Sequence, residues 1–162
     1  MNPAILAGAA SALLLATAAA TPLGAQATGG FPVISARQFT SGTAKLIVTG
    51  AFSINEDVAI NAQASFGDGT MTWLQFGNSG SAQPNALITY GDTKEIGITV
   101  GRGKLIATGG IIPGEASQCT GKVDVKDKLI EGRYTCKGVS SYDPATGKMG
   151  TVDIEVTFTA KS

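Results

Sequence analysis

The chain has 162 residues, a formal net charge of zero and no histidine. This length fits one ordinary domain, and twelve basic residues balanced by twelve acidic ones form no basic stripe, which argues against nucleic-acid binding. Without histidine the chain has no Ser-His-Asp or Cys-His arrangement, and the commonest metal ligand is missing. We therefore expect that the protein has no enzymatic activity and binds no metal or cofactor.

The first 36 residues contain no charged side chain. An apolar and small-residue run over 4–20 leads to a Thr-Pro breaker and then to Ala25-Gln26-Ala27, a small-x-small triplet. This order predicts a secretory signal peptide over 1–27 and a single domain over 28–162. The alternative is a retained membrane anchor, because the apolar run is just long enough to span a bilayer.

After this leader, apolar and polar residues alternate with a period of two, which predicts half-buried strands. Clusters of turn-forming residues, among them 55–57, separate the alternating segments. Many short strands with such spacing predict an all-β, antiparallel β-sandwich, Ig-like or jelly-roll-like, with about 8–10 short strands. The clearest alternating segments are 45–54, 57–66, 95–100 and 151–160.

The two cysteines, Cys119 and Cys136, form an even pair, which in an exported chain predicts a disulfide. If they face each other in a hairpin, the turn falls at Asp127-Lys128. A longer loop near this turn remains an alternative, since Asp-Lys is not a favoured two-residue turn. The same register places these apolar or small residues together on a core face: Gly121, Val123, Val125, Ile130, Gly132 and Tyr134.

Residues 141–150, "SYDPATGKMG", resemble a phosphate-binding loop only in composition. Such a loop needs Gly, four residues and then Gly-Lys-Ser/Thr, and here Tyr142 and Met149 occupy the first and last of these places. The segment therefore predicts a hairpin that joins the Cys136 strand to the last strand, with Tyr142 and Lys148 at an exposed tip.

Acidic residues offer little for catalysis or metal binding. The adjacent pair Glu56-Asp57 is interpreted as part of a turn, and Asp68 in "FGDGT" as a hairpin turn. A calcium site that combines Asp68 with Asp92 from separate loops remains an alternative.

The stretch 69–91 has no charge of either sign but contains aromatic and amide side chains. Neutral, aromatic-rich surfaces suit protein partners. For Trp73 itself the favoured interpretation is that it fills the core, and a place on the interaction surface is the alternative. The candidate interaction residues are Trp73, Phe76, Asn78, Tyr90, Tyr142 and Lys148.

The sequence thus predicts a non-enzymatic binding or structural module that is exported to the periplasm, the cell surface or the medium. Its expected partner is a protein, either a cell-envelope complex of which it is an accessory subunit or another copy. Membrane contact is expected only through a retained N-terminal segment. Two alternatives are a carrier of a small apolar ligand and a surface-filament subunit that exchanges the strand-like segment 28–39.

Overall fold

The computed structural model describes residues 37–91, 95–112 and 114–162, so the predicted signal segment and Asp92 lie outside the described residues. Within these ranges no helix is long and apolar enough to cross a membrane. The described chain forms the strands β1 (Arg37–Gln38), β2 (Ser41–Gly50), β3 (Ile54–Ala59), β4 (Phe66–Gly67), β5 (Met71–Phe76), β6 (Pro84–Gly91), β7 (Ile96–Arg102), β8 (Leu105–Ile111), β9 (Cys119–Lys126), β10 (Leu129–Asp143) and β11 (Lys148–Lys161).

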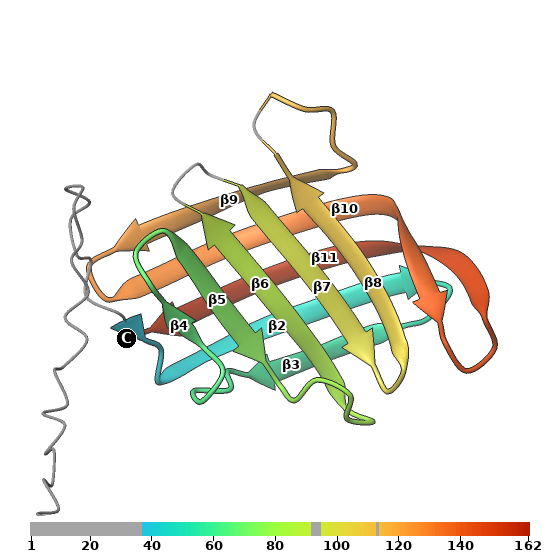
Figure 1. Cartoon of the computed structure of the whole chain (residues 1–162), viewed down its shortest axis with the longest axis horizontal. Helices are drawn as coiled ribbons and strands as arrows, with labels where there is room; N and C mark the ends of the chain where they lie inside the picture. The colour runs from blue at the N-terminus through green and yellow to red at the C-terminus, as the bar shows by residue number, and fades with distance from the viewer. Residues whose placement is uncertain (1–36, 92–94, 113) are drawn as a thin grey trace, which may run out of the picture. The chain divides into compact units, whose positions relative to one another are not determined.

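These strands make one antiparallel sheet in the order β1-β4-β5-β6-β7-β8-β10-β11-β2-β3, and β9 pairs with β10 beside this path. The sheet curls so that β5–β8 lie across β2, β3, β10 and β11 (Figure 1). The predicted all-β antiparallel class is confirmed. The predicted sandwich is not, because the strands of both sides belong to one continuous sheet.

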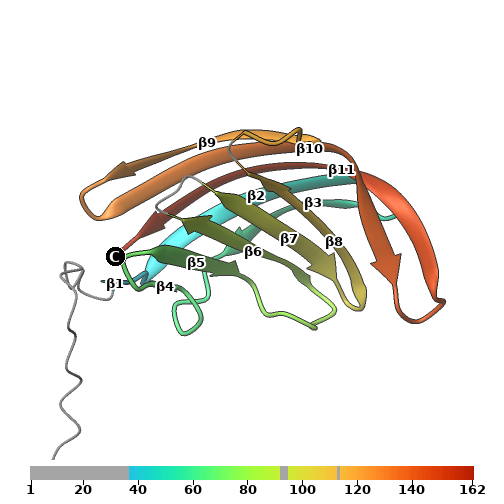
Figure 2. The same ribbon diagram turned by 45° about the horizontal axis from the view of Figure 1, so that its top comes forward.

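The longest strands connect the two sides of the curl. The first part of β10 pairs with β9, whereas Ser141 and Tyr142 near its end pair with β8. The register against β11 shifts between Cys136 and Val139, and Gly138 there has a φ of 62°. Such a bulge bends a strand, and Figure 2 shows β10 and β11 turning down beside β8.

The core lies between the two sides of this curl. Phe158 of β11 is at its centre, with its ring centroid 6.1 Å from that of Phe76 and 6.2 Å from that of Tyr134. All three side chains are almost fully buried. A Cβ on Gly132 would approach the Phe158 ring to 2.4 Å, so only glycine fits opposite this ring. Each large apolar side chain buried here stabilises the fold by about 1.5–3 kcal/mol.

The cysteine hairpin agrees with its predicted register. Cys119 faces Cys136 in a disulfide, and Lys126 pairs with Leu129 across a two-residue turn. Asp127 has a φ of 47°, the left-handed conformation that a tight hairpin turn needs. The predicted core face holds at Ile130, Tyr134 and both cysteines. It fails toward the tip of β9, where Val125 is 47% exposed because the hairpin extends beyond the core.

The predicted turn at 55–57 is wrong. These residues lie inside β3 and pair with β2, while the chain reverses after Gly50, whose φ is 122°. The predicted strand over 57–66 is also interrupted. It ends at Ala59, Ile60 forms a single bridge with Phe76, and the chain turns before β4.

The segment 141–150 forms the predicted hairpin. The Asp143 carboxylate accepts hydrogen bonds from the Ala145 N–H at 2.9 Å and the Thr146 hydroxyl at 2.8 Å. These bonds, with the Thr146 hydroxyl first, lower the pKa of Asp143. Gly147 closes the turn with a φ of 67°, as the sequence predicted.

Candidate functional site

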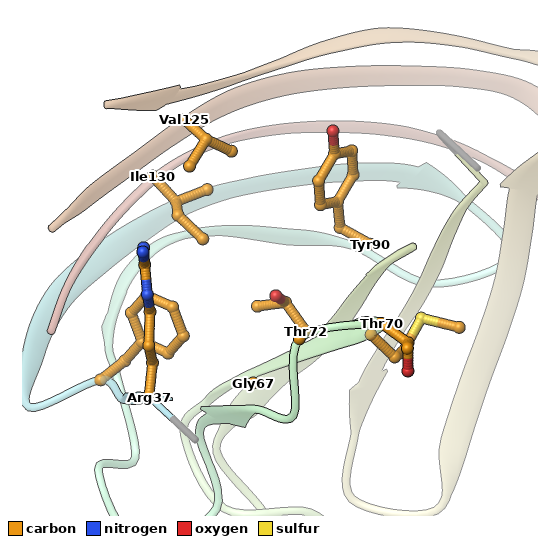
Figure 3. A pocket seen from close by; sticks show the side chains of 10 residues that line it. Arg37, Gly67, Thr70, Thr72, Tyr90, Val125 and Ile130 are labelled. Atoms are coloured by element: carbon orange, nitrogen blue, oxygen red, sulfur yellow. The ribbon is translucent and has the colours of Figure 1, made fainter. Parts of the chain in front are cut away.

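A cavity of about 230 Å³ opens where the β9–β10 hairpin extends beyond the core. Figure 3 shows Val125 and Ile130 entering it from the hairpin, with Thr72 and Tyr90 facing them from β5 and β6. The full lining is Arg37, Phe39, Gly67, Gly69, Thr70, Met71, Thr72, Tyr90, Val125 and Ile130.

Hydrogen bonds from both ends of the described chain hold the hairpin tip over this cavity. The Arg37 guanidinium donates to the Asp127 carbonyl at 2.7 Å, and the Ser162 N–H donates to the Lys128 carbonyl at 2.9 Å. The two acceptor residues, Asp127 and Lys128, form the turn of the hairpin. The hairpin, which forms one wall of the cavity, is therefore held by the N-terminal and C-terminal strands as well as by its own disulfide.

The turn between β4 and β5 forms the opposite rim. The Asp68 carboxylate accepts hydrogen bonds from the N–H of Met71 at 2.8 Å and from the N–H and hydroxyl of Thr70, both at 2.9 Å. These bonds, the Met71 N–H first, lower the pKa of Asp68. Asp68 thus organises a turn, as the sequence predicted. No group of three or more His, Cys, Asp or Glu side chains suited to a metal occurs among the described residues.

The chemistry of the cavity is apolar with one cation at the rim. Arg37 is the single charged residue in the lining, and a guanidinium has five N–H donors. Deeper on the same face of β10, Tyr134 is buried and its hydroxyl has no hydrogen-bond partner among the described residues. Burial, with a smaller effect from nearby Tyr90, raises the pKa of Tyr134 well above its usual range.

The six predicted interaction residues do not form one surface. Phe76 is fully buried in the core, because its side of β5 faces Phe158. Tyr90 lines the cavity, and Asn78 is exposed in the turn after β5, where its side chain accepts a hydrogen bond from Asn61. Tyr142 and Lys148 lie on the distant β10–β11 hairpin.

Trp73 lies on the outer face of β5, because the adjacent residue Leu74 points into the core and successive residues of a strand point to opposite faces. Its ring stacks on that of Phe66 in β4, with centroids 4.9 Å apart. The prediction that Trp73 fills the core is therefore wrong. Phe66 itself is 47% exposed.

Sequence reasoning missed the cavity itself. Its walls come from β1, β4, β5, β6, β9 and β10, which are far apart in the chain. The one usable signal was the alternation that marked Val125 and Ile130 as a facing apolar pair. Their position at the end of the core depends on pairings that the sequence does not reveal.

The Cys119–Cys136 disulfide fits an oxidising environment outside the cytoplasm. Comparison of the chain with protein-family models, with curated proteins and with solved structures found no match. Function must therefore be inferred from the chemistry of the chain's own residues.

Proposed function

We propose that the chain is an exported, non-enzymatic binding protein that holds the apolar end of a small ligand in the cavity beneath the β9–β10 hairpin. The observation that carries the proposal is the lining itself. Phe39, Tyr90, Val125 and Ile130 surround a space of about 230 Å³, and Arg37 stands at its rim. Ligand sites commonly combine an apolar lining with a few polar groups that fix orientation.

The size of the space limits the ligand. A dry cavity of about 150 Å³ can hold benzene, so about 230 Å³ has room for one ring or a short aliphatic chain. The rings at the core, Phe158, Phe76 and Tyr134, are almost fully buried, so the apolar end would insert beside them, into the cavity beneath the hairpin. A carboxylate at the other end would reach the guanidinium of Arg37, with which it can form charge-assisted hydrogen bonds.

The proposed location combines two observations. The charge-free leader with its small-x-small triplet favours export, and the disulfide suits the periplasm, the cell surface or the medium. A binding protein there would meet its ligand outside the cytoplasm. Membership of a cell-envelope complex remains a prediction for which the cavity gives no support.

Binding is tested by titrating the exported chain, as recovered from the producing cell, with benzoate while the methyl signals of Val125 and Ile130 are followed by NMR. Benzyl alcohol has the same ring without the charge. We expect saturable shifts at both methyl groups with both compounds. Arg37→Gln should weaken benzoate more than benzyl alcohol, because both ligands lose the support of the Arg37–Asp127 hydrogen bond and only benzoate also loses a partner for its carboxylate.

Two variants give a matched control. Val125→Trp adds an indole inside the cavity and should abolish the shifts at Ile130. Lys126→Trp adds the same group one residue later, on the other face of β9, and should leave binding intact. If neither benzoate, benzyl alcohol nor hexanoate produces a saturable shift at these methyl groups, the proposal is wrong.

A further inference from the structure

The strands β5–β8 place no ionised side chain on their outer face, although Glu95, the residue before β7, lies at its edge. The one charged residue in these four strands is Arg102, at the end of β7, and it pairs with Glu56 of β3. The residues that point away from the core on this face are neutral: Trp73, Leu87, Thr89, Gly97, Thr99, Ile106, Thr108 and Gly110.

The side chains in one row of paired residues across this face decrease in size from one end to the other. Phe66 pairs with Trp73, Trp73 with Thr89, Thr89 with Gly97, and Gly97 with Gly110. Directly paired residues share a face of a sheet, so two stacked rings stand at one end of the row and two glycines at the other.

The glycine end of this row is hollow. A cavity of about 260 Å³ has Thr89, Gly97 and Gly110 in its lining, together with Met71, Glu95 and Ile112. Ile112 is 49% exposed there. A space of about 150 Å³ holds a benzene ring, so an aromatic side chain from outside fits into this hollow.

A ridge and a hollow at opposite ends of one row are self-complementary. A two-fold axis that lies in the face and crosses the middle of the row, near Thr89, brings the rings of each copy over the glycines of the other. Two-fold contacts of this kind use the same patch on both subunits. The strands bring no charge into the contact, and the one carboxylate in the lining of the hollow, Glu95, is exposed, so the cost that opposes burial of ionised groups is confined to that side chain.

The size of the face is compatible with a dimer of modest affinity. Four strands spaced about 4.8 Å apart, with about seven residues of about 3.3 Å each, span roughly 20 Å by 23 Å. This projected area is about 450 Å², to which the relief of the side chains adds. Stable interfaces bury about 800 Å² on each partner, so we expect weak association.

From these observations we propose that the outer face of β5–β8 is a self-association surface, on which a second copy of this chain packs with its Phe66–Trp73 pair in the glycine hollow. This surface is separate from the ligand cavity. Its partner is identified by the shape of the face and by the absence of charge in its strands, and the proposal does not depend on ligand binding.

Sedimentation equilibrium of the exported chain tests the proposal. We expect a monomer–dimer equilibrium, which Thr108→Glu weakens by at least about tenfold because it places an unpaired charge in the neutral contact. The matched control is Thr157→Glu. It changes an equally exposed strand threonine on the outer face of β11, between Arg133 and Lys45, and should leave the dimer unchanged.

The chain's single tryptophan gives a second readout that does not depend on mass. Dimer formation should shift Trp73 emission to shorter wavelength and reduce its quenching by iodide as the protein concentration rises. Monomers at all concentrations, or a dimer that Thr108→Glu and Thr157→Glu affect equally, would overturn the proposal. So would a monomer whose Trp73 emission responds to dextran or to lipid vesicles, since the face would then serve that partner.

Discussion

The two outer faces of the curled sheet differ in chemistry although one chain of zero net charge forms both. The face of β2, β3, β9, β10 and β11 carries paired ions, whereas the face of β5–β8 is built from Thr, Gly and apolar side chains. The ion pairs of the first face are Lys45–Asp57, Lys122–Asp124, Arg133–Glu155 and Lys137–Asp153.

The inner faces, by contrast, are alike. Both contribute large apolar side chains to one core, in which Phe158 of the charged side packs against Phe76 of the uncharged side. Both sides therefore contribute to the stability of the fold, whereas their outer faces differ in how readily they can bind other molecules. A surface rich in ion pairs stays hydrated, and a neutral one can be desolvated cheaply.

The largest effect should come from breaking the shared core. Phe158→Ala removes a buried ring and should cost about 3–5 kcal/mol in the free energy of unfolding. Because both sides depend on this ring, Trp73 fluorescence and far-UV circular dichroism should report the same urea transition. Thr157→Ala, next to Phe158 but exposed, should stay within about 0.5 kcal/mol of the wild type. Separate transitions would show that the sides are independent units.

Loss of the disulfide should have the next largest effect. Replacing Cys119 and Cys136 together by alanine releases a loop with a sequence separation of 17, which should cost about 3 kcal/mol. Although the bridge joins two strands of the charged side, it rests on Gly109 of β8, where a Cβ would lie 2.7 Å from one sulfur and 2.9 Å from the other. The wild type with a reductant should match the variant; a larger loss in the variant would point to packing rather than to the cross-link.

Two aspartates stabilise the fold through different partners, so acid and salt should change their contributions to stability differently. A cation, Lys137, is the main cause that lowers the pKa of Asp153, whereas neutral donors from Met71 and Thr70 lower that of Asp68. A lowered pKa in the fold means that the ionised form stabilises it above the usual value of 3.8, and that this stabilisation disappears as the pH falls through the folded value.

We therefore expect Asp153→Asn and Asp68→Asn each to destabilise at pH 7 and to destabilise progressively less as the pH falls below 3.8, as measured by urea unfolding. Added salt at pH 7 should shrink the effect of Asp153→Asn, because salt screens its ion pair. The effect of Asp68→Asn should persist. Equal salt sensitivity would contradict the assignment of these causes.

The smallest effect should come from a single ion pair. Arg133→Gln removes the contact with Glu155 on an exposed surface and should cost at most about 1 kcal/mol, less at high salt. Thr99→Val on the other face keeps the shape and should be nearly neutral in stability. Thermal unfolding at two salt concentrations measures both, and a salt-dependent loss for Thr99→Val would mean that the uncharged face senses a nearby charge.

The features that the sequence predicted well are local. The Cys119–Cys136 register and the 141–150 hairpin each depend on residues that are close in the chain, so alternation and turn chemistry were sufficient. The turn at 55–57 was misplaced because Asn and Asp favour turns, whereas the bend at Gly50 and the pairing with β2 keep these residues in a strand.

The remaining features depend on non-local pairings. Whether the strands form one curled sheet or two is decided by the bulge in β10 and by the change of its partner from β9 to β8. The same pairings decide that Phe76 faces the core while Trp73 faces outward, and that Val125 lines a cavity. No spacing in the sequence encodes these outcomes.

The position of β9 has a consequence for how the chain avoids uncontrolled assembly. Within the described chain, β9 pairs with β10 on one side, and beyond its first residues the other edge has no strand partner. An open edge invites strand addition, and natural proteins guard such edges with charged residues, lysine above all. Lys122, Asp124 and Lys126 occupy alternate positions along this edge. These charges protect the edge from non-specific polymerisation, so any partner strand would have to accommodate them.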